Sequence, residues 1–180
     1  MKFYEKIGII IGSTRPGRRS SLIAEWFAKN LPQAELTYDI IDLADFDLPF
    51  LDESEIPQTS TYHHETTKRW SEKIATYAGF IFIVPQYNWG YPAVLKNALD
   101  YLYREWQDKP ACLVTFGGHG GSQAQIALRL VMQGLKMPVL SVAPMITLSP
   151  SASQSEALNT LVAYEPLLPA LEAEFKRYLN

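Results

Sequence analysis

The strongest constraint on the fold of this chain is an alternation of short apolar runs with segments of helical spacing. Nearly continuous apolar runs occupy residues 6–11, 79–84, 111–116 and 139–143, and a mixed apolar run occupies residues 36–43. Strands with this composition are buried on both faces, as in parallel sheets. Five parallel strands are therefore expected.

The segments between these runs carry apolar residues three and four positions apart, which predicts amphipathic helices. Such segments lie at residues 22–27, 70–78, 95–106 and 128–135. A last helix is expected over residues 155–180, interrupted near Pro166 and Pro169. Strands that alternate with helices predict one parallel sheet with right-handed crossovers and helices on both of its faces.

The composition fits one globular domain over residues 1–180. Hydrophobic residues make up 47% of the chain and charged residues 19%, and the formal net charge is −3. This charge argues against a nucleic-acid partner, which normally needs a broad basic face. No apolar stretch approaches the roughly 20 residues that span a bilayer, and residues 1–6 lack the layout of a signal peptide. A cytoplasmic protein without a membrane partner is expected.

Two further features are interpreted structurally. The single cysteine, Cys112, lies in an apolar run and is expected to be a small core residue. Residues 45–61 form a long irregular connection with two prolines and several acidic residues, which is typical of a lid or a partner-facing loop.

The loop at residues 12–20 has the chemistry of a phosphate site. In an open parallel sheet, ligands bind beyond the carboxyl ends of the strands, where the strand order reverses. This loop follows the first strand and offers Gly12, several hydroxyls and the arginines 15, 18 and 19, and a helix is expected to begin near Ser20. Free N–H groups and the helix dipole add to the arginine charge. The alternative is an ordinary turn in which Ser20 or Ser21 caps the helix.

Two known nucleotide-binding motifs are absent from this loop. It matches neither G-x-G-x-x-G, the dinucleotide fingerprint, nor G-x-x-x-x-G-K-[ST], the ATP and GTP cradle. A mononucleotide with one terminal phosphate, such as FMN, needs neither pattern.

The loops after the third and fourth strands complete the expected site. Residues 85–92, with the sequence Pro-Gln-Tyr-Asn-Trp-Gly-Tyr-Pro, offer aromatic surface for a flat heterocycle and polar groups for its edge. Residues 117–121, Gly-Gly-His-Gly-Gly, let the backbone approach a ligand closely and turn N–H groups toward it. The alternatives are a structural aromatic plug and a flexible turn.

Together the three motifs resemble the NADPH-dependent FMN reductases of the flavodoxin-like fold, a group that includes quinone, azo-dye and chromate reductases. The matching motifs are Gly-Ser-Thr-Arg at residues 12–15, the residues 85–92 with Leu-Lys-Asn-Ala-Leu-Asp at 95–100, and residues 117–121. The resemblance implies a three-layer α/β/α sandwich with a five-stranded parallel sheet of order 2-1-3-4-5. Many members have glutamate where this chain has Gln86; binding through backbone atoms would survive that change.

The resemblance also implies the binding residues. The loop at residues 12–20 would hold the FMN phosphate, residues 86–89 would line the isoalloxazine ring, and Gly117 with Gly118 would face its pyrimidine end. The expected cofactor-binding residues are Ser13, Arg15, Arg18, Arg19, Ser20, Pro85, Gln86, Tyr87, Asn88, Trp89, Gly117 and Gly118.

The activity implied is a transfer of electrons from NADPH or NADH, through FMN, to a small acceptor such as a quinone, an azo compound, a metal oxyanion or free flavin. The chemistry is centred on the flavin, so no catalytic side chain is expected. If one open face serves donor and acceptor in turn, the kinetics should be ping-pong. The resemblance further implies a homodimer or homotetramer, and residues 45–61 are expected to contribute to a neighbour's site.

Three other functions fit the sequence less well. A non-enzymatic flavodoxin-like electron carrier would share fold and cofactor but is usually strongly acidic. A hydrolase is disfavoured because no G-x-S-x-G elbow is present, and a short-chain dehydrogenase because no tyrosine precedes a lysine by four residues. His63 and His64 suggest a metal site, but adjacent helical residues point about 100° apart, so a solvated polar face is expected. The same interpretation holds for the aspartates at 39, 42, 45 and 47.

Overall fold

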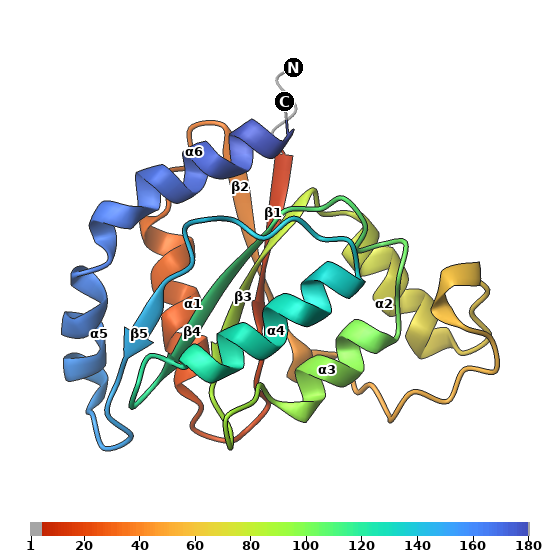
Figure 1. Cartoon of the computed structure of the whole chain (residues 1–180), viewed down its shortest axis with the longest axis horizontal. Helices are drawn as coiled ribbons and strands as arrows, with labels where there is room; N and C mark the ends of the chain where they lie inside the picture. Colours follow the sequence, from red (N-terminus) through yellow and green to blue (C-terminus); the bar gives the residue numbers. More distant parts are fainter. Residues whose placement is uncertain (1–4, 180) are drawn as a thin grey trace.

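The computed structural model describes residues 5–179 and is built around a five-stranded sheet (Figure 1). The strands are β1 (Glu5–Ile11), β2 (Leu36–Asp42), β3 (Gly79–Pro85), β4 (Ala111–Gly117) and β5 (Met145–Thr147). Their order is β2-β1-β3-β4-β5, and every neighbouring pair is parallel. The expected flavodoxin-like order is thus confirmed.

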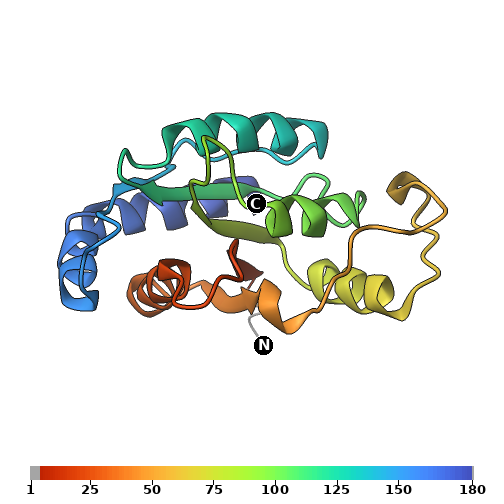
Figure 2. The ribbon, with the colours of Figure 1, turned by 90° about the horizontal axis from the view of Figure 1, so that it is seen from below.

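Helices cover both faces of the sheet, as Figure 2 shows from below. The helices are α1 (Arg19–Asn30), α2 (Glu65–Ala75), α3 (Ala93–Asp100), α4 (Ser122–Gly134), α5 (Gln154–Val162) and α6 (Leu168–Leu179). One core joins α1, α5 and α6 to one face, and the other joins α2, α3 and α4 to the opposite face. In β1, Ile9 faces the first core and Ile10 the second, because successive strand side chains point to opposite faces.

The expectation of a fifth strand at residues 139–143 is wrong. Only an isolated bridge between Val139 and Ala111 forms there, and β5 begins at Met145. The N–H groups of Ser141 and Val142 donate to the Glu174 carboxylate, at 2.7 and 2.9 Å, instead of to β4. This segment therefore leaves the sheet and rejoins it after residue 144.

The helix expected over residues 95–106 is shorter in the structure. Helix α3 ends at Asp100, yet Trp106 is fully buried and its indole N–H donates to the carbonyl of Leu99 at 3.1 Å. The apolar spacing beyond residue 100 thus reflects burial in the core and not helix. Near the C-terminus, the expected interruption is confirmed, because a short 3₁₀ turn, Glu165–Leu167, separates α5 from α6.

Two smaller observations concern the rest of the chain. Cys112 is fully buried in β4, as expected. Across residues 5–179, no helix combines the length and the apolar character that crossing a membrane requires.

Candidate functional site

The loops after β1, β3 and β4 lie side by side at the carboxyl edge of the sheet, along the lower edge of Figure 1. The N–H of Gly12 donates to the carbonyl of Ile83 at 2.9 Å, and the N–H of Gln86 donates to the carbonyl of Phe116 at 3.0 Å. A Cβ atom at position 12 would lie 2.9 Å from the Ile83 oxygen, so only glycine fits this close exit from β1. The sheet therefore brings the three expected loops together.

A hollow of about 320 Å³ opens beside the first loop. It is lined by Arg15, Pro16, Gly17, Arg18, Arg19, Ser20, Pro85, Tyr87, Phe116 and Pro150. Six of the expected cofactor-binding residues thus share one cavity. Four of its residues are not among the expected ones: Pro16 and Gly17 lie inside the first loop, Phe116 is the next-to-last residue of β4, and Pro150 follows β5, which was expected at residues 139–143.

The N-terminus of α1 has polar groups that make no hydrogen bond within the described chain. The helix begins at Arg19 with Arg18 as its N-cap residue, and no side chain caps it, so the alternative of a cap by Ser20 or Ser21 is wrong. The Ser20 hydroxyl is buried and has no hydrogen-bond partner among residues 5–179. A buried hydroxyl and an uncapped helix N-terminus suit an anionic oxygen.

The three arginines of the loop have different environments. Arg18 forms an ion pair with Asp42 at the end of β2, so its charge is offset. The Arg19 guanidinium donates to the carbonyl of Ala152. Arg15 is exposed and lies over the ring of Tyr87, 5.5 Å from the ring centroid, and it has no carboxylate partner within the described chain. Arg15 and Arg19 therefore both keep a positive charge that no carboxylate of the described chain offsets, and Arg15 is the more exposed of the two.

The second loop meets the first through Tyr87. Its hydroxyl lies 2.7 Å from the Ser13 hydroxyl, although 74 residues separate them in the sequence. Tyr87 and Gly90 exchange two backbone hydrogen bonds of 2.8 Å, which close a tight turn. The two central residues, Asn88 and Trp89, have φ of 46° and 65°. Left-handed tryptophan is strained, and such strain gathers at functional sites. The turn leaves Trp89 75% exposed.

The third loop offers free backbone donors. Gly120 donates to the Gly117 carbonyl at 3.1 Å, and the Thr115 hydroxyl donates to the Gly120 carbonyl at 2.9 Å. These bonds fold the loop into a tight turn, with φ of 70° at Gly120. The N–H groups of Gly118 and His119 donate to no acceptor among the described residues. They are available to a ligand edge.

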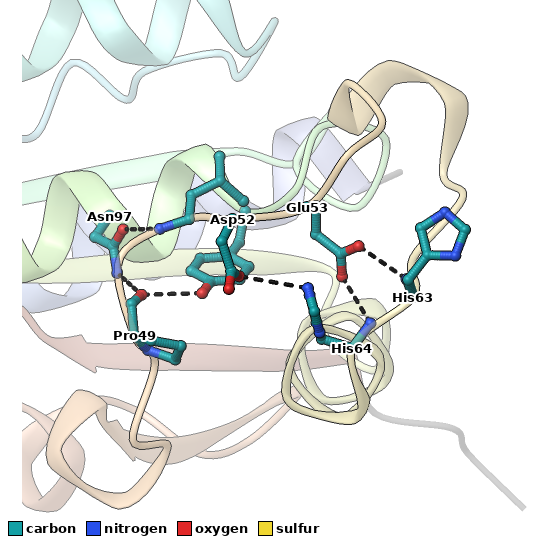
Figure 3. A network of polar contacts seen from close by, with 8 residues as sticks. Pro49, Asp52, Glu53, His63, His64 and Asn97 are labelled. Carbon is teal, nitrogen blue, oxygen red and sulfur yellow. Dashed lines mark hydrogen bonds and ion pairs between the residues drawn. The ribbon is translucent and has the colours of Figure 1, made fainter.

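The connection after β2 is fastened to its own chain (Figure 3). The Asn97 side chain donates to the Pro49 carbonyl at 2.7 Å and accepts from the Leu51 N–H at 3.1 Å. These bonds bracket Phe50, which remains 86% exposed. A second hollow, of about 450 Å³, lies between Phe50 and Tyr91. Sequence spacing gave no signal for Asn97, because its partners lie 46 and 48 residues away.

His63 and His64 also hold the connection after β2 in place, through contacts with Glu53 and Asp52. The Glu53 carboxylate accepts the N–H groups of His63 and His64 at 2.9 and 3.0 Å, and the His64 ring lies 3.5 Å from the Asp52 carboxylate (Figure 3). Within residues 5–179, no three histidine, cysteine or carboxylate side chains are grouped to hold a metal ion.

Comparisons with known proteins agree with this geometry. Residues 5–149 match the family model described as NADPH-dependent FMN reductase. An NAD(P)H-dependent FMN reductase of Schizosaccharomyces pombe is 38% identical, with 99% of this chain aligned to 90% of that protein. A quinone reductase of Pseudomonas putida is 30% identical, over 97% and 92% of the two chains. The flavoenzyme FerB of Paracoccus denitrificans, an NAD(P)H:(acceptor) oxidoreductase, superposes with a TM-score of 0.77 at 20% identity, over 97% and 98% of the chains.

Sequence and fold therefore agree on an oxidoreductase that uses FMN and NAD(P)H. The alternative of a non-enzymatic electron carrier is set aside, because the relatives are reductases. The chain belongs to the NADPH-dependent FMN reductase family.

Proposed function

We propose that this chain passes electrons from NADPH or NADH to a small acceptor through FMN held by the loops after β1, β3 and β4. The acceptor would be a quinone, an azo compound, a metal oxyanion or free flavin. The observation that carries the proposal is the hollow at the start of α1, where Arg15, an uncapped helix N-terminus and the unpartnered Ser20 hydroxyl converge. Bound FMN would supply the redox chemistry.

The first loop would bind the phosphate. Ser20 would donate its free hydroxyl, and the N–H groups of the first turn of α1 would donate along the helix axis. Arg15 and Arg19 would add charge-assisted bonds. Ser13 would act together with Tyr87, whose hydroxyl it contacts. Arg18 would contribute less charge, because Asp42 already offsets it.

The other two loops would hold the ring. Pro85, Gln86 and the strained turn with Asn88 and Trp89 would form its platform, and Gly117 with Gly118 would face its pyrimidine edge. The free N–H of Gly118 would favour the electron-rich form of the ring, in the manner of preorganised donors. No side-chain nucleophile is required.

A single open face would serve the donor and the acceptor in turn. The large exposure of Trp89 supports a platform that faces solvent. Ping-pong kinetics follow, with parallel lines in double-reciprocal plots of initial rates. Intersecting lines would refute the shared face.

Assembly into a homodimer or homotetramer is part of the proposal. Phe50 and Ile56, exposed by 86% and 63%, lie in the 45–61 connection, and the hollow beside Phe50 also contains Tyr91 of the platform loop. We propose that this connection contributes to a neighbouring copy's site. Sedimentation equilibrium of the wild-type chain and of Phe50→Ser tests this, since a monomeric wild-type protein would refute it.

Arg15→Ala tests the phosphate site. Loss of one charge-assisted bond costs about 1.5–3 kcal/mol, which weakens FMN binding roughly 10- to 150-fold. Riboflavin lacks the phosphate, so its affinity should change by less than about threefold. Arg177→Ala is the matched control, because Arg177 is an exposed arginine in the last turn of α6.

Flavin fluorescence titrations measure both affinities. Equal losses for FMN and riboflavin would show that the loop does not hold the phosphate. A wild-type protein that takes up no FMN would refute the proposal as a whole.

A further inference from the structure

Gln86 joins both ends of the glycine-rich loop at residues 117–121. Its backbone N–H donates to the carbonyl of Phe116, immediately before the loop, at 3.0 Å. Its side-chain oxygen accepts from the N–H groups of Gln123 and Ala124, in the first turn of α4, at 3.1 and 3.2 Å. One residue at the end of β3 thus fixes both the strand and the helix that flank the loop.

Helix α4 depends on this contact for its cap. Its own N-cap residue, Gly121, has no side chain to cap with and lies at φ of 72°. The Ser122 hydroxyl contacts Gln123 and not the backbone. The Gln86 oxygen therefore takes the place that a serine or aspartate N-cap fills in other helices, although it lies more than 30 residues earlier in the chain.

The cap is neutral, and this matters electrostatically. The N-terminus of a helix carries a partial positive charge of about half an elementary charge. An amide oxygen satisfies the N–H groups without cancelling that charge, whereas a carboxylate would more than cancel it. The unpartnered N–H groups of Gly118 and His119 lie in the same loop.

We infer that Gln86 is a positioning residue of the FMN site: it holds the Gly118 and His119 N–H groups in place and, as a neutral cap, leaves the positive end of α4 to favour the reduced cofactor. This inference rests on the proposed function. The Gln86 side chain has two roles in this inference: its hydrogen bonds fix the loop, and its lack of charge preserves the helix dipole. A separate substitution tests each role.

Gln86→Leu removes both side-chain bonds at nearly constant size. The loop loses its side-chain contact with the first turn of α4, so FMN should bind about tenfold more weakly. Hydrogen exchange at Gly120, Gln123 and Ala124, whose N–H groups are hydrogen-bonded in the wild-type protein, should become faster in the flavin-free protein. The matched control is Gln133→Leu, the same change at an exposed position near the other end of α4.

Gln86→Glu keeps an oxygen that accepts from both N–H groups and adds a charge. Oxidised FMN should bind within about twofold of wild type, while reduced FMN should bind about tenfold more weakly. That ratio corresponds to a two-electron midpoint potential about 30 mV lower. Gln133→Glu adds the same charge at the far end of α4 and should leave the potential unchanged.

The outcomes separate the inference from the proposed function. A wild-type protein that does not bind FMN defeats the proposed function. If wild type binds FMN and Gln86→Glu has an unchanged potential, the neutral-cap role is wrong. If Gln86→Leu has wild-type exchange rates and FMN affinity, the fastening role is wrong. Should Gln86→Leu fail to fold, Gln86→Asn, whose shorter side chain cannot reach the same N–H groups, replaces it with the same expectations.

Discussion

The carboxylate of Glu174 should make a large contribution to the free energy of unfolding. It lies on α6, is 7% exposed, and accepts the N–H groups of Ser141 and Val142 at 2.7 and 2.9 Å. These two N–H groups belong to the segment that leaves the sheet before β5, so they have no strand partner. Replacing Glu174 by glutamine keeps one acceptor but turns an NH₂ group toward the second donor.

The magnitude follows from the two charge-assisted bonds. Each such bond contributes about 1.5–3 kcal/mol, so Glu174→Gln should lower the free energy of unfolding by about 2 kcal/mol. Glu174→Ala leaves both donors unsatisfied and should cost about 4 kcal/mol. The single Arg177 contact, at 3.5 Å from a guanidinium in a largely exposed side chain, adds little.

The effect should depend on pH. Burial alone would raise the pKa of the Glu174 carboxyl, but the N–H groups of Val142 and Ser141 outweigh it and hold the pKa below its ordinary value of 4.5. A group with a lowered pKa in the folded state stabilises the protein above its unfolded-state pKa. The difference between wild type and Glu174→Gln should therefore be constant from pH 6 to 8, by the same linkage, and shrink below about pH 4.5.

Urea unfolding followed by circular dichroism measures these differences. Glu72→Gln is the control, because Glu72 is exposed on α2 and should change stability by less than about 0.5 kcal/mol. A loss at Glu174 no larger than that of the control, or one that persists unchanged at pH 3, would refute the role assigned to the two bonds.

Two further predictions concern the connection after β2 and the core. Asn97→Ala should cost about 1–2 kcal/mol and speed proteolysis between residues 45 and 61. Asn97→Asp still accepts from Leu51 but turns a carboxylate oxygen toward the Pro49 carbonyl, so it should cost at least as much; proteolysis rates equal to that of wild type would contradict the role given to the two Asn97 bonds. Cys112 should resist thiol reagents in the native protein and react only in concentrated urea, because full burial raises the pKa of its thiol; fast native labelling would contradict this.

Local pattern was enough for the centre of the sheet. The runs of β1, β3 and β4 are apolar on both faces, and the structure buries them between two helical layers. The fifth strand was misplaced because residues 139–143 are equally apolar. What removes them from the sheet is a carboxylate on α6, more than 30 residues later, which no local pattern reveals.

In the site, too, local sequence patterns predicted some features and not others. The three loops were recognisable from glycines, arginines and aromatic residues that lie close together in sequence, and the sheet brings these loops together. The partners of individual side chains were not recognisable. Three contacts join residues more than 20 positions apart in the sequence. They are the ion pair of Arg18 with Asp42, the hydrogen bonds between Gln86 and α4, and the hydrogen bonds of Asn97 with the connection after β2. Such contacts depend on how the elements pack.

The 74-residue separation between Ser13 and Tyr87 has a consequence for the life of the protein. The hollow exists only once β1 and β3 have paired and the segment after β5 has reached Arg19, 133 residues away. A partly folded chain therefore has almost no binding site for the cofactor. Bound ligand would slow unfolding and leave the folding rate nearly unchanged. When flavin is scarce, newly made chains would fold at their usual speed, but the empty ones would open more often and meet proteases sooner.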